Sequence, residues 1–277
     1  MTVKPFLKWV GGKRQLLTDI APLVPDKFSR YIEPFVGGGA VFFHLSQKMT
    51  AQEIPSLIND INPELVNCYQ MVKTQTDALI SLLKTHKHEK NYYLAIRNLD
   101  RQEGGLSVLS PLERASRFLY LNRTGFNGMY RLNSKGLNNV PFGRYKNPSF
   151  VNEHVLRASA KALIDTQISS QSFQDCLRSA RKGDFVYLDP PYVPLNETSY
   201  FTSYIKNGFT MNDQKSLAEL VTELDKRGVV FVASNSCVPA VRELYGSFRQ
   251  IEVKAKRAIN AHGHKRSAIS ELLITNI

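Results

Sequence analysis

Short apolar runs alternate with helix-like segments at both ends of the chain, and this alternation strongly constrains the fold. Tyr31–Glu33 precedes a glycine turn and a helix from about Ala40, and Ser56–Asn59 precedes a helix that opens at Asn62-Pro63, a typical N-cap and first helical position. Later runs predict strands in "GDFVYLDPPY" and "GVVFVASN", helices over about 212–226 and near residue 240, and closing strands in "SFRQIEVKA" and "ISELLITNI". Strands that alternate with helices predict a parallel sheet.

The alternation stops in the middle of the chain. Residues from Thr76 to about Ile164 contain polar-faced helices and a long segment rich in Gly, Asn, Arg and Tyr, with little strand signal. We therefore predict an α/β fold: a doubly wound, Rossmann-like domain built from residues 1–75 and 165–277, with a mainly helical second domain inserted over 76–164. Within the insertion, "NRTGFNGMYRLNSKGLNNVPFGRY" is typical of a β-hairpin whose tip is set by glycine and asparagine.

The composition favours an acidic partner. The chain has 277 residues, 43% of them hydrophobic, and a formal net charge of +12. Such a charge favours nucleic acid first and an anionic membrane second. No apolar stretch approaches the roughly 20 residues of a spanning helix, and the N-terminus lacks the apolar core of a signal peptide. We expect a cytoplasmic protein that does not contact membranes.

Cysteine and histidine usage argues against disulfides and against a metal. Cys68, Cys176 and Cys237 are isolated and odd in number, which fits a reducing compartment. The pairs His86/His88 and His262/His264 have no third ligand nearby, so we interpret them as solvated or facing phosphate. We expect no metal in the reaction.

The turn "EPFVGGGA" lies between a strand and a helix, where doubly wound folds bind nucleotides. Gly37 and Gly39 allow close approach of a ligand, and Asp60, 21 residues after Gly39, lies where such folds bind ribose hydroxyls. Phe42 stands where a dinucleotide fingerprint requires Gly or Ala, so no pyrophosphate loop is evident. S-adenosylmethionine is the obvious candidate ligand, and a plain strand-to-helix turn is the alternative.

The tetrapeptide "DPPY" ends another predicted strand. Asp189 would point into the crevice at the carboxyl ends of the strands, where ligands bind. Pro190 and Pro191 stiffen the backbone and present fixed carbonyls, and Tyr192 offers a flat face. Two acceptors beside an aromatic plane suit an exocyclic amine on a stacked ring. The alternative is a stiff strand end with a capping aspartate.

Five motifs along the chain closely resemble those of the Dam-type, D12 class adenine-N6 DNA methyltransferases. In chain order they are "PFLKWVGGK", "EPFVGGGA", "LINDIN", "FLYLNRTGFNGMYRLNSKGLNNVPFGRYKNP" and "DPPY". The resemblance spans nearly the whole chain. It implies an S-adenosylmethionine-dependent methyltransferase domain with an inserted target-recognition domain.

The resemblance also assigns roles at the site. It implies that the cofactor is held by Trp9, Lys13, Phe35, Gly37, Gly39, Asp60 and Asp189. Asp189, the Pro190 carbonyl and Tyr192 would serve the target adenine. Phe173 matches a cofactor-adjacent position loosely, and a plain core position is the alternative.

The region from Pro111 to Pro148 is basic and aromatic, with a single acid, Glu113. Its basic residues are Arg114, Arg117, Arg123, Arg131, Lys135, Arg144 and Lys146. Interleaved with them are Phe118, Tyr120, Phe126, Tyr130, Phe142 and Tyr145. Basic groups can bind phosphates while aromatic rings stack or wedge between bases. A solvated basic face is the alternative.

In the resembled family this hairpin enters the major groove at GATC. By motif, Phe126 would wedge beside the target base and Asn127 would support the distorted site. The remaining implied DNA contacts are Met129 and Pro141 to the inner bases, Arg131 to a guanine, Arg144 and Tyr145 to the backbone, and Lys8 to the first guanine. A second basic run, residues 254–266, is either a phosphate clamp or an ordinary exposed loop.

We therefore predict a monomeric enzyme, bacterial or phage-encoded, that methylates adenine N6 in double-stranded chromosomal DNA and releases S-adenosylhomocysteine. It would flip the adenine out of the stack, and a nearby cation would keep Asp189 ionised. Cytosine-N4 methylation, RNA adenine methylation and a DNA-binding module with a dead site are the alternatives. An intact "DPPY" argues against the last of these.

Overall fold

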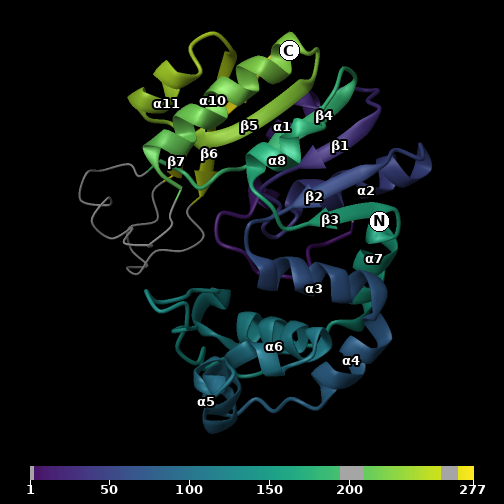
Figure 1. Ribbon diagram of the computed structural model, residues 1–277, viewed down its shortest axis with the longest axis vertical. Helices are drawn as coiled ribbons and strands as arrows, with labels where there is room; N and C mark the ends of the chain where they lie inside the picture. Colours follow the sequence, from purple (N-terminus) through teal and green to yellow (C-terminus); the bar gives the residue numbers. More distant parts are fainter. Residues whose placement is uncertain (1–2, 194–208, 257–267) are drawn as a thin grey trace.

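The computed structural model describes residues 3–193, 209–256 and 268–277, whose elements form an α/β structure around one sheet (Figure 1). The sheet has the strand order β3-β2-β1-β4-β5-β7-β6. Its strands are β1 (Arg30–Glu33), β2 (Ser56–Asn59), β3 (Thr166–Ser169), β4 (Asp184–Leu188), β5 (Val230–Ser236), β6 (Arg249–Lys256) and β7 (Ala268–Thr275). The first five pair in parallel, and β7 pairs antiparallel with both β5 and β6.

Helices cover both faces of the sheet, as a doubly wound fold requires. Successive strand residues belong to different cores: Tyr31 and Phe185 pack in one cluster, and Ile32 and Val186 in the other. The helices of the first cluster include α2 (Ala40–Ala51) and α3 (Pro63–Thr74), and those of the second include α8 (Phe173–Arg178), α10 (Met211–Lys226) and α11 (Pro239–Leu244). The predicted α/β class is confirmed.

The middle of the chain is helical, as predicted, and lies beside α3 in the lower part of Figure 1. It contains α4 (Thr76–Lys84), α5 (Lys90–Asn98), α6 (Pro111–Thr124) and α7 (Glu153–Leu163). The first hydrophobic cluster continues without a break from Tyr31 in the sheet to Phe118 and Leu156 in these helices. The division into domains at residues 75 and 165 therefore remains a prediction, and a shared core joins the two parts.

Two local predictions need correction. The edge strand β3, Thr166–Ser169, was not predicted, because its sequence TQIS is polar and only its first residue is buried. The predicted hairpin reverses the chain, but its described legs meet through two isolated antiparallel bridges, Gly125↔Phe142 and Leu132↔Asn138, and form no regular ladder. We call residues 125–143 the recognition loop.

The start of α3 is set by its own sequence. The Asn62 side chain accepts hydrogen bonds from the N–H groups of Glu64 and Leu65, at 3.1 and 3.3 Å, and Pro63 occupies the first helical position. This arrangement satisfies helix N–H groups that would otherwise lack partners. It fixes the direction of the chain directly after Asp60, at the carboxyl end of β2.

None of the helices in the described ranges combines the length and the apolar character needed to cross a bilayer. The three cysteines are free thiols, and Cys68 and Cys176 are buried.

Candidate active site

The glycine turn after β1 is packed tightly on both sides. Gly37 and Gly39 have φ values of 46° and 70°, in the left-handed region that favours glycine. A Cβ atom on Gly37 would lie 2.8 Å from the Trp9 ring, and one on Gly39 would lie 2.6 Å from the Tyr69 hydroxyl. That hydroxyl donates a hydrogen bond to the Gly37 carbonyl at 3.0 Å. The turn is thus held by Tyr69 and covered by Trp9, so both glycines are sterically required.

Asp60 links this turn to α3. One carboxylate oxygen accepts from the Gly37 N–H at 3.1 Å, and the other accepts from the Asn62 N–H at 2.9 Å. Burial raises the pKa of Asp60, and the two N–H groups act in the opposite direction. The structure therefore brings Asp60 beside Gly37, as predicted for two parts of one site.

Asp189 follows β4 and lies against a cation. Its Oδ1 atom is 2.9 Å from Lys13 Nζ and accepts a hydrogen bond from the Ser234 hydroxyl at 2.9 Å. Burial raises the pKa of Asp189, whereas Lys13 and Ser234 oppose that rise. Among the described residues both of these contacts engage Oδ1, so Oδ2 is the oxygen that remains for a ligand. The expected cation is Lys13, whose side chain is only 5% exposed.

Tyr192 is oriented by an acid that the sequence reading missed. Its hydroxyl donates to Glu271 Oε2 at 2.5 Å, and the Lys13 ammonium lies 4.4 Å from the centre of its ring. Burial, followed by the charge of Asp189, raises the pKa of Tyr192 well above its usual value. An acid inside the apolar run "ISELLITNI" was the available signal for Glu271, but nothing local connects it with Tyr192.

The two prolines are buttressed by α10. The Pro191 carbonyl accepts a hydrogen bond from Gln214 Nε2 at 2.8 Å, and Gln214 Oε1 accepts from Asn235 Nδ2 at 3.0 Å. Among the described residues no hydrogen bond to the Pro190 carbonyl is found, so this carbonyl is the available acceptor. Gln214 and Asn235 were not predicted.

Phe35 lies in an aromatic group beside the glycine turn. Its ring centre is 5.5 Å from that of Phe173 and 5.7 Å from that of Phe209. Phe173 belongs to the second hydrophobic cluster and is 9% exposed. A core position and a position beside the cofactor site are both compatible with this placement.

A buried acid lies under the site. Glu33, at the end of β1, is 2% exposed and accepts a hydrogen bond from the Tyr31 hydroxyl at 2.7 Å. Burial raises its pKa to about 8, with further contributions from the charges of Asp189 and Asp60. The sequence reading did not single out Glu33, although an acid at the end of an apolar strand was a signal.

The N-terminal segment and the recognition loop meet at Asn122. This buried side chain accepts from the Lys8 N–H at 3.0 Å and donates to the carbonyls of Lys8 and Gly128, at 2.7 and 2.9 Å. The Lys8 ammonium lies 4.8 Å from the centre of the Tyr145 ring. The structure thus brings Lys8, near the Trp9–Lys13 segment, to the residues predicted to read DNA.

Several predicted DNA contacts lie on the surface of the loop. Phe126 is 48% exposed, an unusual position for a large apolar ring, and Asn127 has a φ of 55°. Arg131, Pro141 and Arg144 are exposed, whereas Met129 is half-buried. Arg131 Nε donates to Asn139 Oδ1 at 2.7 Å. The half-buried Tyr145 donates to the Gly125 carbonyl at 3.2 Å.

Three basic residues of this region have partners within the protein, and one of them, Arg117, is buried and cannot face phosphate. Arg114 pairs with Glu64 in the first turn of α3, Arg123 donates to the Phe6 carbonyl, and Arg117 is buried against Asp100. Among the aromatic residues, Phe118 and Tyr120 are core residues at 1% and 0% exposure. A sequence pattern counts charges and rings, but it does not reveal which of them α6 turns inward.

His86 is not solvated either, contrary to prediction. It exchanges hydrogen bonds with Tyr92 and Ser116, both at 2.9 Å, and stacks on Tyr120 with ring centres 4.4 Å apart. Burial lowers its pKa to about 4. His88 packs against Phe142, at 4.9 Å between ring centres. His262, His264 and most of the basic run 254–266 lie outside the described residues.

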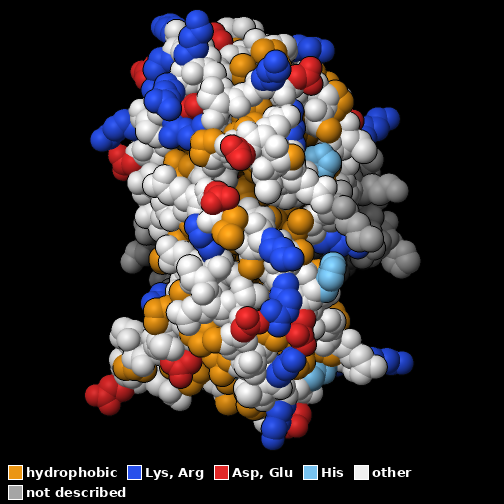
Figure 2. All heavy atoms as spheres, turned by 90° about the vertical axis from the view of Figure 1, so that its right-hand side faces the viewer, with side chains coloured by type: hydrophobic (Ala, Val, Ile, Leu, Met, Phe, Trp, Pro, Cys, Tyr) orange, Lys and Arg blue, Asp and Glu red, His pale blue; other side chains and the backbone are white. Residues whose placement is uncertain are grey.

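The surplus of positive charge extends beyond the loop. Figure 2 shows Lys and Arg side chains along the whole height of one side of the molecule, with Asp and Glu between them.

A hollow lies at the amino ends of β2 and β3, at the opposite end of the strands from Asp60 and Asp189. It is lined by residues that include Ser46, Ser56 and Thr166 and contains none of the predicted site residues. Within the described ranges, no group of three or more His, Cys, Asp or Glu side chains is arranged to hold a metal.

A doubly wound sheet with a glycine turn after β1 and Asp-Pro-Pro-Tyr after β4 defines a class of methyltransferase. The chain belongs to the D12 class N6 adenine-specific DNA methyltransferases, whose family model matches residues 9–259. It is therefore a DNA adenine-N6 methyltransferase.

Named relatives cover nearly the whole chain. The Type II methyltransferase M1.LlaDCHI of Lactococcus lactis subsp. cremoris is 44% identical, over 100% of this chain and 96% of that protein. The Type II methyltransferase M.MjaIII of Methanocaldococcus jannaschii is 42% identical over 100% of both chains. The DNA adenine methylase of Escherichia coli (strain K12) is 36% identical over 98% of this chain and 94% of that protein.

The pKa of Glu33 predicts a pH dependence of stability. A folded-state pKa of about 8, above the ordinary value of 4.5, means that the folded state binds this proton more tightly than the unfolded state. The contribution of this proton to the free energy of unfolding is present at low pH and is lost as the pH rises from about 5 to 8.

Glu33→Gln cannot ionise, so the free energy of unfolding of the variant should rise relative to that of the wild type over this pH range. Urea unfolding at four pH values measures the difference, with the exposed Glu103→Gln as control. Parallel curves for wild type and Glu33→Gln would contradict the assignment.

Proposed function

We propose that the protein transfers the methyl group of S-adenosylmethionine to N6 of adenine in double-stranded DNA at GATC, and releases S-adenosylhomocysteine. The placement of Asp189 carries this proposal. Its carboxylate lies at the end of β4, held by Lys13 at 2.9 Å, with Tyr192 beside it and the Pro190 carbonyl available. This constellation provides acceptors and a stacking face for an amino-substituted ring.

The residues around the glycine turn fit S-adenosylmethionine. Gly37 and Gly39 present backbone without side chains, Trp9 lies over the turn, and Phe35 lies beside it. The Asp60 carboxylate at the end of β2 suits ribose hydroxyls. When bound, the cofactor supplies an electrophilic methyl group. The ion pair of Lys13 with Asp189 connects this site to the site that we assign to adenine.

Asp189 and Pro190 would hold the adenine amine. Asp189 Oδ2 accepts one amine hydrogen and the Pro190 carbonyl accepts the other, which leaves the nitrogen lone pair free to attack. Because burial raises the pKa of Asp189, its carboxylate is a better proton acceptor than an exposed aspartate. Tyr192, oriented by Glu271, supplies a face for the ring.

The adenine must leave the DNA stack to reach Asp189, at a cost of a few kcal/mol. The exposed Phe126 ring suits the space beside the displaced base. We assign Arg131 to a guanine, Met129 and Pro141 to inner bases, Lys8 to the first guanine, and Arg144 and Tyr145 to the backbone, with Asn127 supporting the distorted site. We also infer a monomer that acts on chromosomal DNA in the cytoplasm.

Asp189→Ala should abolish methyl transfer, because the amine loses its principal acceptor, and Asp189→Asn should retain at most a trace. Both variants should fold, because Glu271 Oε2, 4.0 Å from Lys13 Nζ, remains as a counter-charge for the buried ammonium. Transfer from tritiated S-adenosylmethionine to duplex DNA, followed by nucleoside analysis, gives the rate and identifies the methylated base. Asp175→Ala, at an exposed site on α8, is the control. Substantial turnover by Asp189→Ala would remove this residue from the catalytic role, and methylcytosine as product would overturn the substrate assignment.

Asp60→Ala should weaken S-adenosylmethionine binding by about 1–3 kcal/mol, as expected for loss of a charged acceptor. Calorimetry measures the affinity. Asp60 also helps to fix the start of α3 through the Asn62 backbone N–H. Asn62→Ala is therefore the matched control: it removes the side-chain cap of α3 but keeps the Asp60 carboxylate and the N–H that it binds. Equal losses in both variants would make Asp60 a structural residue of the turn.

Arg131→Ala should reduce discrimination at the outer GATC base pair by about 1–3 kcal/mol, since arginine to guanine is a specific major-groove contact. Arg144→Ala should weaken binding to all sequences alike and reduce the salt slope by about one unit. Methylation rates on GATC and one-base variants at two salt concentrations separate these roles. A uniform loss for Arg131→Ala would make Arg131 a backbone contact.

A further inference from the structure

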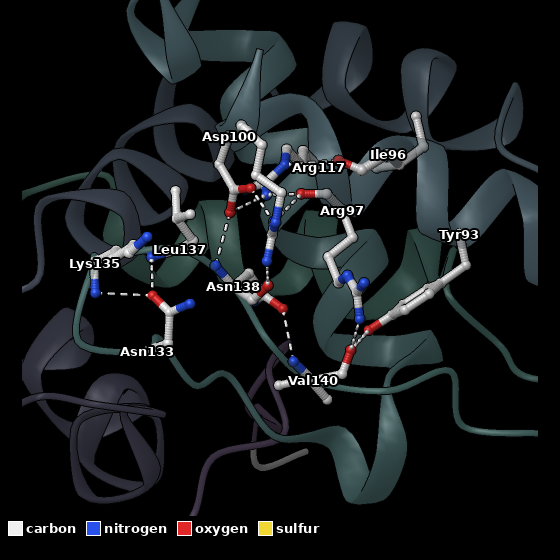
Figure 3. A network of polar contacts seen from close by, with 11 residues as sticks. Tyr93, Ile96, Arg97, Asp100, Arg117, Asn133, Lys135, Leu137, Asn138 and Val140 are labelled. Atoms are coloured by element: carbon white, nitrogen blue, oxygen red, sulfur yellow. Dashed lines mark hydrogen bonds and ion pairs between the residues drawn. The ribbon is translucent and has the colours of Figure 1, made fainter.

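One leg of the recognition loop, residues 138–141, is anchored to the helical layer by polar side chains (Figure 3). The Asn138 N–H donates to Asp100 Oδ2 at 2.7 Å, and Arg101, at the end of the 3-10 turn Leu99–Arg101, donates to the Asn138 carbonyl. The Asn138 side-chain oxygen accepts from the Val140 N–H at 3.1 Å. These contacts satisfy backbone groups that a strand ladder would otherwise pair.

The same leg is held a second time, two residues further on. The Val140 carbonyl accepts from the Tyr93 hydroxyl at 2.9 Å and from Arg97 at 3.2 Å, both on α5. Asn138 and Val140 are 0% and 1% exposed, whereas Asn139 is half-buried and Pro141 is exposed. Buried, anchored residues therefore alternate with more accessible ones along this leg.

The two more accessible residues contact parts of the proposed reading surface. Asn139 holds Arg131 Nε at 2.7 Å, and its N–H donates to the Arg131 carbonyl at 3.1 Å. The Pro141 carbonyl accepts from the Phe126 N–H at 2.8 Å. A displacement of Asn138 or Val140 would therefore move Arg131, Pro141 and Phe126 together.

A buried ion pair lies at the centre of this anchor. Asp100 Oδ2 is 2.9 Å from an Arg117 nitrogen, and the two side chains are 6% and 4% exposed. Arg117 also donates to the carbonyls of Ile96 and Arg97, at 2.9 and 2.7 Å. Asp100 Oδ1 pairs with its chain neighbour Arg101. The carboxylate of Asp100 is thus fixed by Arg117 of α6 and by Arg101, and it is presented to the loop through Oδ2.

The anchor is not the most stabilising solution for this space. Arg117 and Asp100 must be desolvated, and the buried side-chain nitrogen of Asn138 has no hydrogen-bond partner among the described residues. An apolar contact would hold the leg at lower cost, but it would not define the register. Hydrogen bonds to successive backbone groups define the register of the leg, because a slip of one residue breaks all of them.

We propose that Asp100 is a positioning residue for sequence recognition. Held by Arg117, its carboxylate fixes the position and register of residues 138–141, and thereby the position in which Arg131 and Pro141 contact DNA. This role rests on the proposed function, since it requires that the recognition loop reads bases. Preorganisation of this kind increases discrimination by preventing the loop from adapting to a wrong sequence.

Two substitutions test the role. Asp100→Asn keeps the shape and one acceptor for the Asn138 N–H but removes the charge that pairs with Arg117 and Arg101, whereas Asp100→Ala removes the acceptor as well as the charge. The measured quantity is the ratio of methylation rates on the preferred site of the wild-type protein and on its one-base variants. We expect this ratio to fall about fivefold for Asp100→Asn, within the range for loss of a direct base contact, and further for Asp100→Ala. Calorimetry should show unchanged S-adenosylmethionine affinity.

The control is Glu64→Gln, which breaks the ion pair of Glu64 with Arg114 between α3 and α6 and removes none of the hydrogen bonds that anchor residues 138–141. This variant should retain the wild-type ratio. Urea unfolding of each variant verifies that the protein is folded at the assay temperature, and Asp100→Asn keeps the test valid if Asp100→Ala does not fold.

The outcomes separate the two proposals. If the wild-type protein methylates DNA adenine without sequence preference, the proposed site-specific function fails, and the role of Asp100 fails with it. If the wild-type protein discriminates and both Asp100 variants discriminate equally well, even at reduced rate, the positioning role alone is overturned. An equal loss of discrimination in Glu64→Gln would also overturn it, because general loosening of the helices would then suffice.

Discussion

The ion pair between Lys13 and Asp189 holds the site together. A buried ammonium is tolerated only beside a counter-charge. The carboxylate of Asp189, 2.9 Å away, is the nearer one, and Glu271 lies at 4.0 Å. The contact with Asp189 ties the N-terminal segment to the end of β4, while Trp9 from the same segment covers the glycine turn. Without this ion pair, Asp189 would lack the cation that opposes the rise of its pKa on burial, and Tyr192 would lose the ammonium over its ring.

Features with a local cause were readable from the sequence. The cap and proline at Asn62-Pro63 specify the start of α3 through contacts within three residues, and the structure shows them as predicted. The strands of the sheet centre were equally clear, because burial on both faces requires apolar runs. The edge strand β3 lacks this requirement and was missed.

Features that depend on distant partners were not readable. Ser234 on β5, Gln214 on α10 and Glu271 on β7 reach the Asp-Pro-Pro-Tyr segment, and no pattern near them in the sequence indicates these contacts. The same limitation explains the error at Arg117. A basic residue in a basic region was interpreted as a phosphate contact, yet one acid 17 positions earlier, Asp100, holds it inside the helical layer. Residue counts predict the sign of the net charge of a region, but they do not show which of its charged side chains are already paired within the protein.

The six residues from Lys8 to Lys13 perform three tasks in succession. The Lys8 backbone is bound by Asn122 next to the recognition loop, Trp9 packs on the turn at Gly37, and Lys13 reaches Asp189. Five peptide steps extend to at most about 17 Å, so this segment limits how far the recognition loop can move from Asp189 without breaking the contacts of Asn122 or Lys13. In the proposed function, the loop assigned to reading DNA and the carboxylate assigned to the adenine are thus joined by one short stretch of chain.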